Sequence, residues 1–148
     1  MDEAKISFDA GGLTIEGLLG GDVSGGAVVI THPHPLYGGE MHNGVVDAVV
    51  RACRQKGLAT LRFNFRGVGQ SQGHYDEGIG EQDDVRAAVS YLDELGAPAI
   101  DLAGYSFGAW VNASAIGSLA SVNRLIMVSP PVNFMDFSFL NIPPNSVS

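Results

Sequence analysis

The chain has 148 residues, of which 45% are hydrophobic and 16% charged, and its 8 Lys+Arg against 16 Asp+Glu give a net charge of −8. This apolar content supports a folded core and excludes a disordered chain, which would combine low hydrophobicity with high net charge. The acidic balance, with no clustered Lys/Arg stripe in the sequence, excludes nucleic acid as an expected partner.

The sequence also carries information on compartment. Its single cysteine, Cys53, excludes an internal disulfide framework. The segment Met1–Lys5 has neither the basic nor the apolar region of a signal peptide, and no run approaches the ~18 apolar residues that a membrane span needs. We therefore expect a cytoplasmic protein with no membrane partner.

The first half of the chain alternates short strands with one helix. Lys5–Asp9 and Leu13–Leu19 flank a Gly-Gly turn and predict an antiparallel hairpin. Ala27–Thr31 is a continuous, largely β-branched run, typical of a strand that is buried on both faces. Apolar residues then recur at helical spacing over 45–53, and Gly57 is expected to end that helix.

The second half continues the alternation. Ala59–Phe65, Ala99–Gly104 and Asn123–Ser129 predict three further strands. Helices are expected over 81–95, with acidic residues in the first turn that suit the helix dipole, and from Phe107 to about Leu119. This order predicts an α/β fold with a mostly parallel sheet, an N-terminal antiparallel hairpin and helices on both faces. With no linker or repeat, residues 1–148 are expected to form a single domain.

One pentapeptide carries the clearest chemical signal. Gly104-Tyr105-Ser106-Phe107-Gly108 is a G-x-S-x-G sequence that falls between a predicted strand and a predicted helix. A serine on such a sharp, strained turn needs small neighbours two residues away on either side, and a helix N-terminus beside it supplies backbone N–H donors. The plain alternative is a glycine-rich turn in a chain with 20 glycines. The strand–turn–helix context favours a nucleophile elbow.

Three motifs in order along the chain carry a family resemblance: His32-Pro33-His34-Pro35-Leu36-Tyr37-Gly38-Gly39, Asn64-Phe65-Arg66-Gly67-Val68-Gly69-Gln70-Ser71, and Gly104–Gly108. Together they resemble the α/β-hydrolase superfamily, and most closely its small, lid-poor, dienelactone-hydrolase-like esterase branch. The resemblance covers roughly residues 5–140. It implies hydrolysis of small carboxylic esters through an acyl-enzyme, with no metal or organic cofactor.

The resemblance also implies residue roles. Ser106 matches the nucleophile, and Phe107 matches the residue whose N–H forms half of the oxyanion hole. The second N–H is implied to come from the loop after the strand ending at Thr31, where Pro35 has no N–H, so Leu36 and His34 are the candidates. The Arg66–Ser71 loop is implied to shape the rim. Histidines 32 and 34 lack a convergent third ligand, and we expect no metal site there.

The usual partners of a catalytic serine do not follow Ser106. In this superfamily the chain order is Ser, Asp/Glu, His, but all four histidines precede Ser106 and Asp136 is the one acidic residue after it. The resemblance therefore implies a domain lacking its C-terminal third. Three alternatives stay open: a fragment of a longer esterase, an inactive domain that only binds, and a rearranged set with His34, His42 or a partner chain's histidine as base and Asp136 as acid.

Two further expectations concern the last segment. The aromatic and Met neighbours of Asp136 are expected to line an apolar acyl pocket rather than assist proton transfer; they are Phe134, Met135, Phe137 and Phe139. In such a shortened domain the strand over 123–129 would be a sheet edge with unpaired N–H and C=O groups. A homo-oligomer through that edge is therefore expected.

Overall fold

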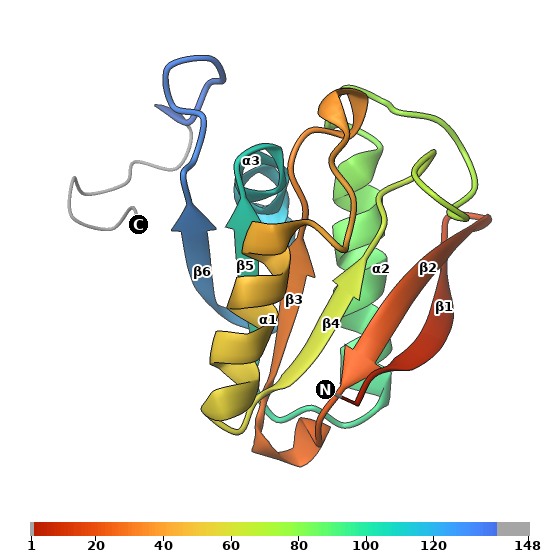
Figure 1. Cartoon of the computed structure of the whole chain (residues 1–148), viewed down its shortest axis with the longest axis vertical. Coiled ribbons are helices and arrows are strands. Elements are labelled where there is room, and N and C mark those ends of the chain that lie inside the picture. The colour runs from red at the N-terminus through yellow and green to blue at the C-terminus, as the bar shows by residue number, and fades with distance from the viewer. Residues whose placement is uncertain (1, 139–148) are drawn as a thin grey trace.

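A six-stranded mixed sheet forms the centre of the computed structural model, which describes residues 2–138 (Figure 1). The strand order is β1-β2-β4-β3-β5-β6, and β4, β3, β5 and β6 run parallel while β1 and β2 form the antiparallel hairpin. The strands are β1 (Ala4–Ala10), β2 (Leu13–Gly20), β3 (Ala27–Thr31), β4 (Ala59–Phe63), β5 (Ile100–Tyr105) and β6 (Val122–Val128). The predicted α/β class, hairpin and parallel sheet are confirmed.

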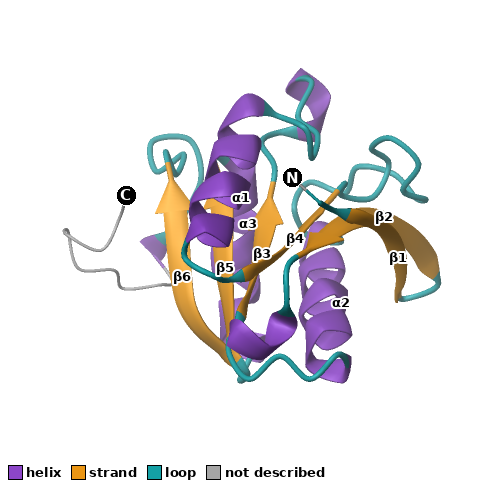
Figure 2. Ribbon diagram, turned by 60° about the horizontal axis from the view of Figure 1, so that its bottom comes forward, coloured by secondary structure: helices purple, strands orange, loops and turns teal. Residues whose placement is uncertain are grey.

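Helices cover both faces of the sheet, as predicted. Helix α1 (Gly44–Gln55) packs on one face, whereas α2 (Glu81–Glu94) and α3 (Phe107–Ala115) pack on the other (Figures 1 and 2). The period of two along a strand explains the division, because alternate residues of β3 point to opposite faces. Val29 joins the larger core cluster under α2 and α3, and Val28 joins the smaller one under α1.

Helix boundaries follow local chemistry. Asn43 caps α1, its Oδ1 accepting the N–H groups of Val45 and Val46 at 2.9 and 3.3 Å. Gly57 follows that helix with a φ of 82°, which agrees with its predicted role as terminator. The helix that was expected to reach Leu119 instead ends as an α-helix at Ala115 and tightens into a 3₁₀ turn over Ile116–Ser118.

The loops that follow the parallel strands gather at one edge of the sheet, at the top of Figure 1. They include a 3₁₀ turn over Pro35–Tyr37 after β3, the long segment 64–80 after β4, and the turn 129–135 after β6. In an open α/β sheet, ligands bind at this carboxyl edge. Within residues 2–138, no helix is long and apolar enough to cross a membrane.

Candidate functional site

Ser106 lies at the sharp turn between β5 and α3. Its φ of 55° and ψ of −114° fall in a region that L-residues rarely adopt. The turn is held on the neighbouring strand, because the Ser106 N–H donates to the carbonyl of Val128 at the end of β6, at 3.0 Å. The sharp strand–turn–helix conformation therefore falls at the residue where the motif predicts it.

Two close backbone approaches explain the glycines of the motif. A Cβ atom at Gly104 would lie 2.5 Å from the backbone nitrogen of Ala109. A Cβ at Gly108 would lie 2.5 Å from Thr31 Oγ1 and 2.7 Å from the carbonyl oxygen of His32. These distances are too short for any side chain, so the two glycines let α3 sit directly on the ends of β5 and β3.

The strain at Ser106 leads to a stability prediction. Replacing Ser106 by glycine is expected to raise the free energy of unfolding by roughly 1 kcal/mol, because a strained non-glycine conformation costs about 1–3 kcal/mol and the added freedom of glycine in the unfolded chain offsets part of the gain. Ser106→Ala is the matched control, since it keeps the Cβ and should leave stability unchanged. Urea unfolding of both variants measures the difference, and equal stabilities would show that the turn is not strained.

Ser106 opens into a cavity of about 350 Å³. Its walls come from the loop after β3, the start of α3 and the turn after β6, and most of them are apolar. The lining residues are His34, Tyr37, Ser106, Phe107, Pro131, Phe134 and Met135. The loops therefore bring the predicted serine together with two of the predicted backbone donors, and with Phe134 and Met135 of the expected acyl pocket.

The backbone N–H groups near Ser106 differ in whether they already have a hydrogen-bond acceptor. Within the described residues, the N–H groups of Phe107 and His34 have no hydrogen-bond acceptor, and both residues line the cavity. The N–H of Leu36 instead donates to Nδ1 of His34 at 3.1 Å. The sequence left Leu36 and His34 as equal candidates for the second oxyanion donor, and their roles stay predictions.

His34 lies in the cavity with both ring nitrogens engaged. Nδ1 accepts from Leu36, and Nε2 lies 3.2 Å from the hydroxyl of Tyr75. The ring packs 4.8 Å from Phe107, centroid to centroid. Burial lowers the pKa of His34, and the negative charge of Glu81 opposes that shift. In this arrangement His34 presents no free imidazole nitrogen to Ser106.

Within residues 2–138, no other histidine lies in position to act as a base for Ser106. None of the four forms a hydrogen bond with Ser106. His42 and His74 are exposed in the loops after β3 and β4. His32 is fully buried and bridges two strand ends: its Nε2 accepts the N–H of Phe65 at 3.0 Å, and its Nδ1 donates to the Pro33 carbonyl at 2.7 Å. Burial lowers the pKa of His32 to about 4, with the Pro33 hydrogen bond opposing.

Asp136 does not line the Ser106 cavity. The side chain is exposed and accepts the N–H of Ser138 at 2.9 Å, a hydrogen bond that lowers its pKa. The carbonyl of Asp136 accepts the indole N–H of Trp110 at 3.0 Å. Phe137 packs against the cluster of Ala109, Ala113 and Met127 and does not line the cavity. Phe139 lies outside the described residues.

Several positioning residues were not recognised from the sequence. Arg66, at the start of the rim loop, makes a bidentate ion pair with the fully buried Asp84 of α2, with its Nη2 2.8 Å from Oδ1. Glu81 is also fully buried and accepts the N–H groups of Asp76 and Gly78, both at 2.9 Å. The sequence placed both carboxylates in the first turn of a helix, where the dipole alone explains them, so nothing marked them as anchors for the loop.

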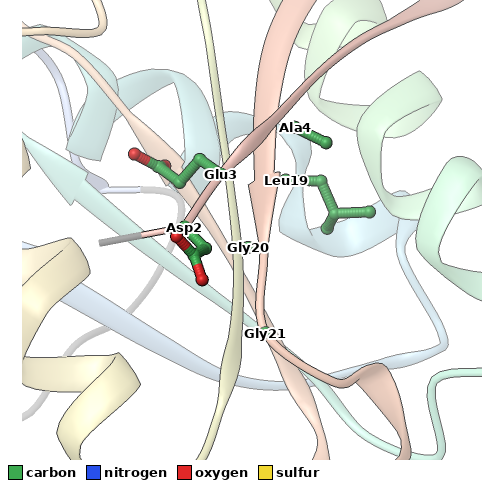
Figure 3. Close-up of a pocket in the computed structure, with 6 residues that line it drawn as sticks. All are labelled: Asp2, Glu3, Ala4, Leu19, Gly20 and Gly21. Atoms are coloured by element: carbon green, nitrogen blue, oxygen red, sulfur yellow. The ribbon is translucent and has the colours of Figure 1, made fainter.

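Other hollows lie away from Ser106. Figure 3 shows one of about 430 Å³ at the start of β1 and the end of β2, where Asp2 and Glu3 lie beside Leu19 and Gly20. The Glu3 carboxylate is already paired with Arg62. The described part of the chain contains no group of three or more His, Cys, Asp or Glu side chains that would hold a metal ion.

Comparison with known proteins places this site in a family. No protein-family model matches the chain. An α/β serine hydrolase homologue from Coxiella burnetii is 37% identical and superposes with a TM-score of 0.84, over 95% of this chain and 69% of that one. XC6422 from Xanthomonas campestris, described as an α/β serine hydrolase without a lid, is 34% identical with a TM-score of 0.87, over 99% of this chain and 69% of that one.

The chain belongs to the α/β serine hydrolase family. This confirms the resemblance that the three motifs carried. It is also 42% identical over 117 residues to the uncharacterised protein RP471 from Rickettsia prowazekii (strain Madrid E), a match that covers 76% of this chain. The chain spans about half the length of that relative, 49%.

Proposed function

We propose that this chain carries the nucleophile and the oxyanion hole of a serine esterase that cleaves small carboxylic esters through an acyl-enzyme on Ser106. The observation that carries the proposal is the strained serine at the start of α3, open to a cavity beside two unpaired backbone N–H groups. The substrate is a small molecule, in keeping with the size of that cavity. Membership of the hydrolase family supports the reaction class.

The chemistry follows from the positions of these groups. Ser106 Oγ attacks the ester carbonyl carbon and its proton passes to water, the bond from that carbon to the alkoxy oxygen breaks, and the leaving alkoxide takes a proton from water to leave as the alcohol. Water then hydrolyses the acyl-serine to the carboxylic acid and restores the Ser106 hydroxyl. The negative charge on the carbonyl oxygen is stabilised by the N–H of Phe107 at the positive end of α3 and by the N–H of His34. Losing one such donor typically slows the reaction about 10²–10³-fold.

A specific observation supports a second candidate function. Because no histidine is hydrogen-bonded to Ser106 within residues 2–138, the same cavity would suit a domain that binds a small molecule without turning it over. A serine without a base is a weak nucleophile. The two candidates therefore differ in the reactivity of one hydroxyl.

Covalent labelling separates these candidates. The 148-residue protein is treated with a fluorophosphonate, and its intact mass is measured before and after. The esterase predicts one added phosphonyl group on the wild type and none on Ser106→Ala, because the reagent needs an activated serine beside an oxyanion hole. An unmodified wild-type mass under conditions that label a control esterase would leave the binding function.

The homo-oligomer stays a prediction. Among the described strands, β6 pairs only with β5 and forms an edge of the sheet. The nearby face toward α1 has an apolar hollow of about 390 Å³ whose lining includes Val49, Cys53 and Ile126. An unpaired strand beside an apolar hollow is the kind of surface on which a second copy could pair.

A further inference from the structure

Most of the large apolar side chains that remain exposed lie on the loops at the carboxyl edge of the sheet. Six large hydrophobic residues are exposed in the described chain, and five of them lie on the loops after β3, β4 and β6. The five are Leu36, Tyr37, Ile79, Val132 and Phe134, with Phe134 90% exposed and Tyr37 87%. The sixth, Leu95, follows α2 at the opposite edge of the sheet. Two of the five, Tyr37 and Phe134, also line the Ser106 cavity, and exposed apolar side chains at a cavity mark a binding site.

The wall formed by Phe134 and Met135 is held by its own backbone. The N–H groups of both residues donate to the carbonyl of Pro131, each at 3.0 Å, and the N–H of Val132 donates to the carbonyl of Pro130 at 2.9 Å. This closed turn places two apolar side chains on the cavity without help from a ligand. A preformed wall of this kind binds with little ordering entropy to offset.

Among the described residues, no Lys or Arg side chain lines this cavity. The chain has 8 Lys+Arg, and all of them lie in the described residues, but none lines the cavity around Ser106. Arg66 is the one on the surrounding loops, and its guanidinium is held by Asp84. Among the lining residues, His34 feels the negative charge of Glu81, which opposes the lowering of its pKa by burial.

We propose that the substrates are esters of uncharged, apolar acyl groups, and that Phe134 and Tyr37 determine this specificity. The proposal rests on the proposed esterase function and adds its substrate class. An alkyl chain would lie against the Phe134–Met135 wall, where each methylene removed from water adds roughly fourfold in affinity. A carboxylate on the acyl group would lose its hydration with no cation to replace it.

The test compares p-nitrophenyl esters of the straight-chain acids from acetate to hexanoate, together with the half-ester of succinic acid. We expect the acylation rate at low substrate, read from the p-nitrophenolate burst, to rise roughly fourfold per methylene. The succinyl half-ester should react at least about tenfold more slowly than the butanoate of the same length. Phe134→Ser and Tyr37→Ser should flatten the series, whereas Leu95→Ser, an exposed apolar residue away from the cavity, should not.

A binding measurement keeps the two proposals separable. Trp110, the single tryptophan, lies 6.3 Å from the ring of Phe107, centroid to centroid, so its fluorescence reports on the cavity. Ser106→Ala is titrated with the primary amides of the same acids and with succinamic acid. Chain-length dependence without any fluorophosphonate labelling would support the ligand class and overturn the esterase. Labelling with a flat series, or with equal reaction of the succinyl ester, would overturn the specificity and leave the esterase standing.

Discussion

Replacing Asp84 by alanine is expected to lower the free energy of unfolding by about 3–5 kcal/mol. Asp84 is fully buried, and the Arg66 side chain is 13% exposed, so removing the carboxylate leaves a guanidinium without its partner in a largely dry site. The backbone N–H of Arg66, which donates to Asp84 Oδ2 at 2.9 Å, loses its acceptor as well. Burial raises the pKa of Asp84 although Arg66 opposes the shift, so the intact pair contributes much less than its rupture costs.

Two comparisons make this prediction specific. Asp83→Ala breaks the pair with Arg86, whose side chains are 37% and 60% exposed, and should cost less than about 1 kcal/mol. The double variant Arg66→Met with Asp84→Leu should recover part of the loss, because an apolar pair of similar volume can replace a buried ion pair, while the backbone N–H at position 66 stays without its acceptor. Urea denaturation measures all three. An Asp84→Ala variant no less stable than Asp83→Ala would show that the pair does not anchor the rim.

Acidification from pH 6.5 toward pH 4 is expected to lower the free energy of unfolding by about 3 kcal/mol through His32 alone. The pKa of His32 is about 4 in the folded protein, against 6.5 for the free side chain. Between these two pH values, His32 is protonated in the unfolded chain but neutral in the folded chain. The free energy of unfolding therefore falls by up to about 1.4 kcal/mol for each pH unit as the pH is lowered through this range. Protonation would also turn Nε2 into a donor facing the N–H of Phe65.

The experiment follows unfolding in urea at several pH values between 7 and 5, above the range where most carboxylates titrate. His32→Gln should show a flatter profile than the wild type, while His74→Gln, a change at an exposed histidine, should run parallel to it. If His32→Gln does not fold, proton NMR of the wild type gives the same information. A His32 ring signal that titrates near pH 6.5 in the folded protein would contradict the prediction.

The elements of this fold were largely predictable because each carries its own periodicity. The strand Ala27–Thr31 appears with the bounds predicted for it, since a buried strand reads as an uninterrupted apolar run. The strand expected over Ala59–Phe65 ends at Phe63. The N–H of Phe65 donates to the His32 side chain rather than to a neighbouring strand, and Asn64 Oδ1 accepts the N–H of Met41 at 2.8 Å. Such long-range side-chain bonds leave no local trace in the sequence.

The site was predictable to a lesser degree. The serine and its glycines could be located, since a strained turn between a strand and a helix restricts residue type over five positions. The sequence did not distinguish Leu36 from His34, because the hydrogen bond that engages the Leu36 N–H forms within a 3₁₀ turn. The anchoring roles of Glu81 and Asp84 were also hidden. Acidic residues in the first turn of a helix are already explained by the helix dipole, so the sequence gives no sign that they also bind groups far along the chain.

The pairing of β3 with β5 has a consequence for how the protein folds. Thr31 at the end of β3 pairs with Gly104 near the end of β5. The two sides of the cavity therefore come from segments that are far apart along the chain and that meet only when β3 and β5 pair. Closing so long a loop is entropically costly and slows folding. A chain that has formed only its hairpin and its helices has no cavity. Binding at Ser106 therefore requires the completed sheet, and a ligand of this cavity would stabilise only the folded chain.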